Sequence, residues 1–210
     1  MLYKNFIWDF DGTIIDTYPA TINSILKTMK EYNVNLNYEE VYKKAKVTLR
    51  YVFDYIKNEY NFNNEIVDKI LYDFSKISPK DRIKYDKIEE VLIYIKKNDG
   101  KNFLVTNRDS KSTLDILDFY NLKYLFEEIV TSDDGFKLKP NPESFNFLIN
   151  KYSLSLNKTI GIGDRKLDIE AAKNSNIASV FMNFDIIKSN YNADFVFNNY
   201  NDFYKNILMR

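Results

Sequence analysis

The chain contains no cysteine and no histidine among its 210 residues. Without cysteine it forms no disulfide, has no thiolate nucleophile and builds no cysteine metal site. Without histidine it has no Ser-His-Asp triad, no phosphohistidine route and no histidine-ligated zinc. Carboxylates are therefore the side chains best suited to nucleophilic and metal-binding chemistry in this protein.

The chain also lacks an excess of charge and a long hydrophobic run. It has 30 basic and 30 acidic residues, so nothing indicates nucleic acid or an anionic membrane surface as a partner. No apolar run approaches the ~20 residues that span a bilayer, and the N-terminus has no signal-peptide architecture. We expect a cytoplasmic protein that is either a monomer or a homodimer.

Glycine and proline are scarce, with five and four residues respectively, and their positions divide the chain. No glycine lies between residues 13 and 99, and Pro19 and Pro79 bracket a segment of strong helical periodicity. Apolar residues such as Ile22, Ile25 and Met29 recur at the spacing of one helix face. We expect about four helices over residues 17–80, given typical helix lengths.

Strands and helices alternate in the rest of the chain. We expect strands at 5–9, 102–106, 128–131, 159–163, 178–182 and 194–197. We expect helices near 86–99, 110–121, 142–152 and 166–175. This order predicts an α/β fold with a parallel sheet and helices on both of its faces. Such sheets bind ligands at the carboxyl ends of their strands, which is where Asp9, Thr106 and Asp164 stand.

An acidic pair follows the first predicted strand, in the segment Asp9-Phe10-Asp11-Gly12-Thr13. Residues two apart in a strand point to one face, and Gly12 lets the backbone turn sharply after it. The two carboxylates can then serve one reacting centre, one as nucleophile and the other as acid and base. The simpler interpretation is a turn in which Asp11 caps backbone amides. Three further segments favour the catalytic interpretation.

Of these three segments, one ends the predicted strand at 102–106, one precedes the predicted helix near 142–152, and one ends the predicted strand at 159–163. Thr106 offers a hydroxyl, and the next backbone N–H can donate beside it, so together they can hold phosphate oxygens. Lys139, before Pro140, can supply fixed positive charge to a carboxylate nucleophile and to a phosphoryl group. Asp164 and Asp168, one helical turn apart, offer the hard oxygen ligands that Mg²⁺ prefers. Taken singly, these residues are equally typical of a β-branched strand end, a solvated turn and a helix cap.

In this order and spacing, the four segments resemble the haloacid dehalogenase superfamily of phosphohydrolases. The resemblance implies a Rossmann-like core at 1–15 and 83–210, with a small all-helical cap at 16–82 inserted after the first strand. It is closest to subclass I, the group of phosphoglycolate phosphatases and β-phosphoglucomutases. One departure precedes the core's first helix, because the family often has Pro-Gly there and this chain reads Tyr85-Asp86-Lys87-Ile88.

The resemblance implies a role for each carboxylate. Asp9 is the nucleophile that forms an aspartyl-phosphate, and Asp11 is the general acid and base. Asp9, the backbone carbonyl of Asp11, and Asp164 hold Mg²⁺, while Asp168 orients the site from behind. We expect burial and neighbouring carboxylates to favour the protonated form of Asp11, as an acid at neutral pH requires.

Phosphate binding is assigned by the same resemblance to Gly12, Thr106, Asn107 and Lys139. The predicted function is a Mg²⁺-dependent phosphatase that hydrolyses a small organic phosphomonoester through an aspartyl-phosphate. The alternatives are a phosphomutase of the β-phosphoglucomutase type and, in another class, a non-catalytic binding protein on the same fold. The four segments do not separate the phosphatase from the mutase.

Substrate selection is expected in the cap. Lys46, Thr48 and Arg50 lie near the start of its second or third helix, and polar residues in a similar region of phosphoglucomutase relatives meet the distal group of the substrate. The simpler interpretation is that these three residues form a solvated helix face.

Overall fold

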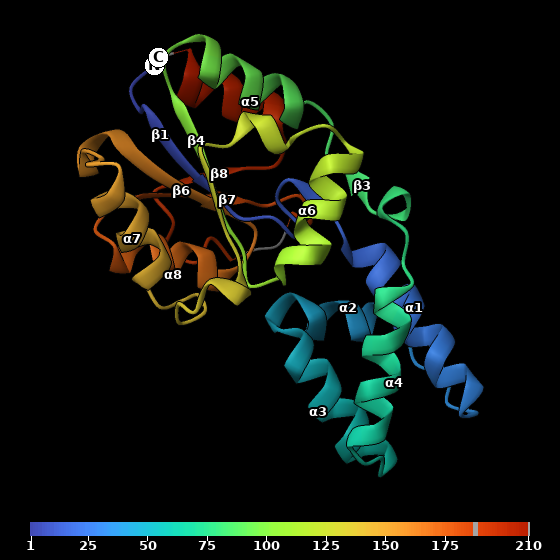
Figure 1. Ribbon diagram of the computed structural model, residues 1–210. Coiled ribbons are helices and arrows are strands. Elements are labelled where there is room, and N and C mark those ends of the chain that lie inside the picture. Colours follow the sequence, from blue (N-terminus) through green and yellow to red (C-terminus); the bar gives the residue numbers. More distant parts are fainter. Residues whose placement is uncertain (187–188, 210) are drawn as a thin grey trace. The chain divides into compact units, whose positions relative to one another are not determined.

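A computed structural model describes residues 1–186 and 189–209 (Figure 1). It divides into two compact units. The core unit comprises residues 1–15 and 84–210, and the helical unit comprises residues 16–83.

A six-stranded sheet forms the centre of the core unit. Its strands are β1 (Asn5–Trp8), β4 (Lys101–Val105), β5 (Glu128–Val130), β6 (Thr159–Gly163), β7 (Ala178–Met182) and β8 (Phe195–Phe197). They lie in the order β5-β4-β1-β6-β7-β8, and every neighbouring pair is parallel. β1 is buried along its whole length because it lies between β4 and β6. The predicted α/β fold is confirmed.

Helices cover both faces of this sheet. They are α5 (Ile88–Lys97), α6 (Ser110–Phe119), α7 (Glu143–Lys151), α8 (Lys166–Asn174) and α9 (Tyr200–Phe203), which continues as a π-helical turn over Tyr204–Leu208. Short 3-10 turns lie at Lys123–Leu125, Ser132–Asp134 and Leu156–Lys158. Successive residues of β1 enter opposite cores, since Trp8 packs in the cluster of α5 and α9 and Ile7 in that of α7 and α8. This alternation explains the continuous hydrophobic run that precedes Asp9.

The helical unit contains α1 (Tyr18–Glu31), α2 (Tyr38–Val47), α3 (Leu49–Tyr60) and α4 (Asn64–Ser75), with a 3-10 turn at Pro79–Asp81. Its core gathers the residues of the predicted apolar faces, including Ile22, Ile25 and Met29, which are fully buried. Side chains of Asn37, Thr48 and Asn63 cap the N-termini of α2, α3 and α4. Four helices in this segment match the number expected.

Two short strands that the sequence did not predict lie where the chain passes from one unit to the other. β2 (Ile15–Asp16) and β3 (Ile83–Lys84) pair with each other as a separate two-stranded sheet. Shortly after β3, Lys87 precedes α5 with a φ of 66°, in the left-handed region.

Across the described residues, no helix has the length and apolar character that a membrane crossing requires.

Candidate active site

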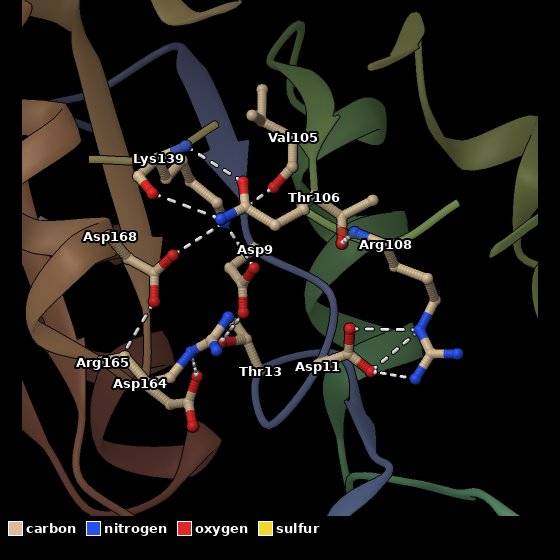
Figure 2. Close-up of polar contacts among 11 residues, drawn as sticks. Asp9, Asp11, Thr13, Val105, Thr106, Arg108, Lys139, Asp164, Arg165 and Asp168 are labelled. Carbon is tan, nitrogen blue, oxygen red and sulfur yellow. Dashed lines mark hydrogen bonds and ion pairs between the residues drawn. The ribbon is translucent and has the colours of Figure 1, made fainter. Parts of the chain in front are cut away.

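The carboxyl ends of three neighbouring strands bring the predicted site residues together. Asp9 follows β1, Thr106 follows β4 and Asp164 follows β6, and β1 lies between the other two strands. The register places Trp8 opposite both Leu104 and Ile162, so the three strands end at the same level. Figure 2 shows the polar side chains that converge at this edge.

Lys139 connects two of the acidic residues. Its Nζ lies 2.5 Å from Oδ1 of Asp9 and 2.7 Å from Oδ1 of Asp168, and it donates a hydrogen bond of 2.9 Å to the carbonyl of Val105. All three charged side chains are buried. The lysine therefore holds the predicted nucleophile in a fixed position and lowers the electrostatic cost of burying it.

Asn107 fixes the backbone of this lysine. Its Oδ1 accepts a hydrogen bond of 3.0 Å from the N–H of Lys139, and its Nδ2 donates one of 3.2 Å to the carbonyl of the same residue. The side chain of Asn107 thus ties the end of β4 to the segment before α7. A contact of Asn107 with phosphate would involve its backbone N–H.

The acidic group can hold a divalent cation. Carboxylate oxygens of Asp9, Asp164 and Asp168 all lie within 4.8 Å of one another, and the three residues are buried. Among the described contacts their cationic neighbours are Lys139 and Arg165, whose Nε is 3.9 Å from Oδ1 of Asp164. Hard oxygen donors of this kind suit Mg²⁺.

The pKa of Asp9 reflects its burial and the charges around it. Burial first and then the charge of Asp168 raise this pKa to about 6, although Lys139 and Arg165 act in the opposite direction. A cation beside Asp9 would favour its ionised form, which is the form that attacks phosphorus.

Asp11 lies apart from this acidic group. Arg108 donates from Nη2 to Oδ1 of Asp11 at 2.7 Å and from Nε to Oδ1 and Oδ2 at 3.0 and 3.1 Å (Figure 2). We expected carboxylates beside Asp11, and the contact described for its side chain is with a cation. The spacing of two residues is informative within a strand, and Asp11 lies beyond the end of β1, where this geometry no longer applies.

The turn that carries Asp11 is held by the backbone and by Tyr200. Gly12 has a φ of 78° and donates its N–H to the carbonyl of Ile15 at 2.7 Å. Thr13 donates its hydroxyl to Oδ2 of Asp9 at 3.3 Å, and its carbonyl accepts a bond of 2.6 Å from the buried hydroxyl of Tyr200. Sequence reasoning missed Tyr200, because no local pattern marks a tyrosine so distant in the chain as a support for this turn.

Gly163 lets Asp168 approach the end of β6. A Cβ atom at position 163 would lie 2.2 Å from the Cβ of Asp168. Oδ2 of Asp168 accepts the N–H of Arg165 at 3.1 Å, while Oδ1 faces Lys139. Asp168 therefore caps the start of α8 and also belongs to the acidic group, which is more than the orienting role predicted for it.

The residues predicted to select the substrate belong to the helical unit. Thr48 accepts a hydrogen bond of 3.0 Å from the N–H of Tyr51 and caps α3. Nζ of Lys46 lies 4.4 Å from the ring centre of Tyr18, and the side chain of Arg50 is 90% exposed. A role of these residues in specificity stays a prediction.

The chain is similar in sequence and fold to known proteins. The family model described as haloacid dehalogenase-like hydrolase matches residues 6–182. The chain is 24% identical over 204 residues to "Pyrophosphatase PpaX" of Oceanobacillus iheyensis, covering 93% of this chain and 90% of the relative. It is 24% identical over 198 residues to "Phosphoglycolate phosphatase" of Colwellia psychrerythraea, covering 90% and 86%. A crystal structure titled as a predicted phosphoglycolate phosphatase from Haemophilus somnus shares the fold, with a TM-score of 0.85, 21% identity and coverage of 100% and 99%.

Proposed function

Because the chain belongs to the haloacid dehalogenase-like hydrolase family and is a phosphohydrolase, we propose that it cleaves a small organic phosphomonoester with Mg²⁺ through an aspartyl-phosphate on Asp9. The observation that carries this proposal is the buried contact of Lys139 with Asp9 and Asp168 beside Asp164. A carboxylate held next to fixed positive charge, at the edge where a parallel sheet binds ligands, suits nucleophilic attack on phosphorus.

Positioning and charge neutralisation make up most of the catalytic effect in phosphoryl transfer. Asp9 attacks phosphorus in line with the leaving oxygen, and Lys139 neutralises charge on both Asp9 and the phosphoryl oxygens. The hydroxyl of Thr106, which accepts the N–H of Arg108 at 3.1 Å, still has its own proton to donate to a phosphoryl oxygen. The backbone N–H of Asn107 is a further donor to these oxygens in the proposed site. The N–H of Gly12, which the resemblance also assigns to phosphate, donates to the carbonyl of Ile15 and would reach a phosphoryl oxygen only if that bond opened.

Asp9, Asp164 and the backbone carbonyl of Asp11 would hold the Mg²⁺ ion, with Asp168 close enough to complete or orient the set. When bound, the ion supplies positive charge to the transferring phosphoryl group. Asp9 attacks phosphorus, and Asp168 holds Lys139 in place.

Asp11 moves the protons in the proposed reaction. It gives one to the oxygen of the leaving alcohol as the aspartyl-phosphate forms, and it takes one from the water that later cleaves this intermediate. Both transfers occur at the same face of the site, so a single carboxylate serves the two half-reactions in turn.

We also propose that the helical unit is a cap that selects the leaving group, with Lys46, Thr48 and Arg50 as its candidate contacts. A substitution of Arg50 by alanine should raise KM for the true substrate and leave kcat near its wild-type value. An unchanged KM would remove Arg50 from this role.

A phosphatase assay with Mg²⁺ and a substrate panel tests the proposal. The panel holds 2-phosphoglycolate and pyrophosphate, after the names of the two relatives, with glucose 1-phosphate and p-nitrophenyl phosphate. Release of phosphate from a monoester, with loss of activity on chelation by EDTA and recovery on adding Mg²⁺, is the expected result. Asp9→Asn should abolish turnover, and near-wild-type activity of this variant would refute the nucleophile.

Two other outcomes would redirect the assignment. Formation of glucose 6-phosphate from glucose 1-phosphate would indicate a mutase in which phospho-Asp9 returns its phosphoryl group to a sugar. Cleavage of pyrophosphate alone would place the chain with the first relative rather than with monoesterases.

A further inference from the structure

We propose that Arg108 is a positioning residue that fixes the carboxylate of Asp11 for proton transfer. The inference rests on the proposed function, in which Asp11 serves as the general acid and base. It adds to that function a residue whose task is to act through Asp11 rather than on the substrate. Arg108 follows Thr106 and Asn107 directly, at the turn between β4 and α6.

The contact between the two side chains restricts Asp11 in both direction and plane. Arg108 offers Nη2 and Nε to Oδ1 and also Nε to Oδ2, at 2.7, 3.0 and 3.1 Å. The side chains are 16% and 19% exposed, so solvent competes little with these bonds. A planar guanidinium that contacts both oxygens sets the orientation of a carboxylate, which a single ammonium group does not do.

Arg108 is itself held at three points. Its Nη1 donates to the hydroxyl of Ser112 at 2.8 Å, its backbone N–H donates to the hydroxyl of Thr106 at 3.1 Å, and its carbonyl accepts the N–H of Ser132 at 3.0 Å. Ser112 lies in the first turn of α6, where its N–H bonds to Oδ1 of Asp109 at 2.8 Å. The backbone of Arg108 is therefore held beside the end of β4, and its guanidinium is anchored to α6.

The contacts of Arg108 add to the restraints on the turn that carries Asp11. Hydrogen bonds from Gly12 to Ile15 and from Ile14 to Phe10 hold the backbone of the turn, and Arg108 restrains the orientation of the carboxylate itself. Proton transfer requires hydrogen-bond distance to the leaving oxygen, and a misplacement of about 1 Å can cost on the order of 100-fold in rate. Removing Arg108 also makes protonation of Asp11 easier, because the guanidinium favours the ionised carboxylate. We expect misplacement to outweigh this gain, with a net loss of about 10- to 100-fold.

The test compares Arg108→Gln with two substrates that differ in their need for a proton. An alkyl phosphate has a poor leaving group that must be protonated, whereas p-nitrophenyl phosphate leaves as a stabilised phenolate. For the alkyl phosphate, kcat/KM should fall about 10- to 100-fold, mostly through kcat. For p-nitrophenyl phosphate, kcat/KM should fall far less, since this ratio reports the steps up to formation of the aspartyl-phosphate. Equal losses on the two substrates would overturn the proposal.

A double-mutant cycle tests whether Arg108 acts through Asp11. In the Asp11→Asn background, Arg108→Gln should cost nothing further, because the group that it positions can no longer carry a proton. A further loss as large as in the wild type would show that Arg108 acts on the substrate directly, and it would overturn the proposal. Arg108→Lys should recover part of the activity, since it restores the charge without the planar fork.

Two additional variants separate positioning from folding. Ser112→Ala keeps Arg108 but removes one of its hydrogen-bond partners. We therefore expect a smaller fall in kcat/KM that again affects the alkyl phosphate more than p-nitrophenyl phosphate. Lys111→Gln removes an 87% exposed cation from the same helix, and it should leave kcat/KM for both substrates unchanged. If Asp11→Asn alone keeps full activity, the proposed function of Asp11 fails. If Asp11→Asn is strongly impaired and both the Arg108 and Ser112 variants have wild-type activity, only the role of Arg108 fails.

Discussion

Lys139 and Asp9 form an ion pair of 2.5 Å in which each side chain is only 1% exposed. The same ammonium group lies 2.7 Å from Asp168, so one lysine compensates two buried carboxylates. Burial lowers the pKa of Lys139, but the charges of Asp168 and Asp9 outweigh this effect, and the resulting pKa lies above its usual value. The lysine therefore stays charged across the neutral range.

Replacing Lys139 by methionine should reduce both stability and activity. Removing one partner of a buried pair leaves a buried charge without compensation, which typically costs about 3–5 kcal/mol. Loss of charge stabilisation at the reacting centre should lower kcat by on the order of 100-fold or more. Urea unfolding and steady-state kinetics measure the two effects.

Lys137→Met is the matched control for this variant. Lys137 lies two residues earlier, is 72% exposed and pairs with Glu143 at 2.7 Å. Exposed pairs of this kind contribute roughly 0–1 kcal/mol, so both stability and kcat should stay close to wild type. Equal effects of the two substitutions would contradict a special role for Lys139.

Binding of Mg²⁺ should weaken as the pH falls through about 6. Burial and the charge of Asp168 raise the pKa of Asp9 to about 6, so Asp9 in the metal-free protein retains its proton to a higher pH than an ordinary aspartate. Below that pH the ion must displace a proton, and its apparent Kd should rise about tenfold for each pH unit. Titration calorimetry with Mg²⁺ between pH 5 and pH 8 measures this change.

A variant of Asp168 checks the cause of that shift. Asp168→Asn removes a charge that raises the pKa of Asp9, so the pH at which Mg²⁺ binding begins to weaken should move downward. A Kd that does not change between pH 5 and pH 8 in the wild type would show that Asp9 is not a ligand.

The residues whose convergence the sequence predicted share a local signal. Asp9, Thr106 and Asp164 each follow a continuous apolar run, and parallel strands place their carboxyl ends along one edge. Knowing where each strand ends was therefore enough to predict that these side chains converge. The fold class followed from the same alternation of apolar strands and amphipathic helices.

The residues that the sequence did not locate depend on contacts between distant segments. Arg108 pairs with Asp11 across 97 positions, and Tyr200 bonds to Thr13 across 187. Neither has a periodicity or motif of its own, since an arginine in a turn and a tyrosine near a C-terminus are common. Their roles depend on loop conformations beyond the strand ends, which spacing rules for regular structure do not describe.

Gly163→Ala should lower stability and activity together. The added Cβ would lie 2.2 Å from the Cβ of Asp168, so Asp168 or the end of β6 must move. Overpacking of this kind typically costs about 1–3 kcal/mol. Since Asp168 also contacts Lys139, kcat should fall beyond what the loss of folded protein explains.

Gly161→Ala separates these two effects, because its Cβ would meet Ala172 and Phe145 at 2.7 and 3.1 Å rather than an acidic residue. A similar loss of stability is expected, with kcat per folded molecule retained. If Gly161→Ala reduces kcat as strongly as Gly163→Ala, the effect is a general response of β6 and not a displacement of Asp168.

Lys87→Gly should stabilise the protein. Lys87 has φ 66° and ψ −8° at the start of α5, a conformation that costs a non-glycine residue roughly 1–2 kcal/mol. Glycine adopts it freely but loses more entropy on folding, by about 0.5–1 kcal/mol, so the net gain should be about 0.5–1 kcal/mol. The exposed ion pair between Lys87 and Glu90 adds little to the balance.

Urea unfolding of Lys87→Gly and of the control Asp86→Gly tests this prediction. Asp86 precedes Lys87 and is not among the residues with positive φ, so glycine there should lower the free energy of unfolding. The resemblance implies Pro-Gly just before this helix, and the left-handed backbone of Lys87 is a conformation that glycine adopts without strain. A Lys87→Gly protein no more stable than wild type would show that this backbone conformation carries no strain.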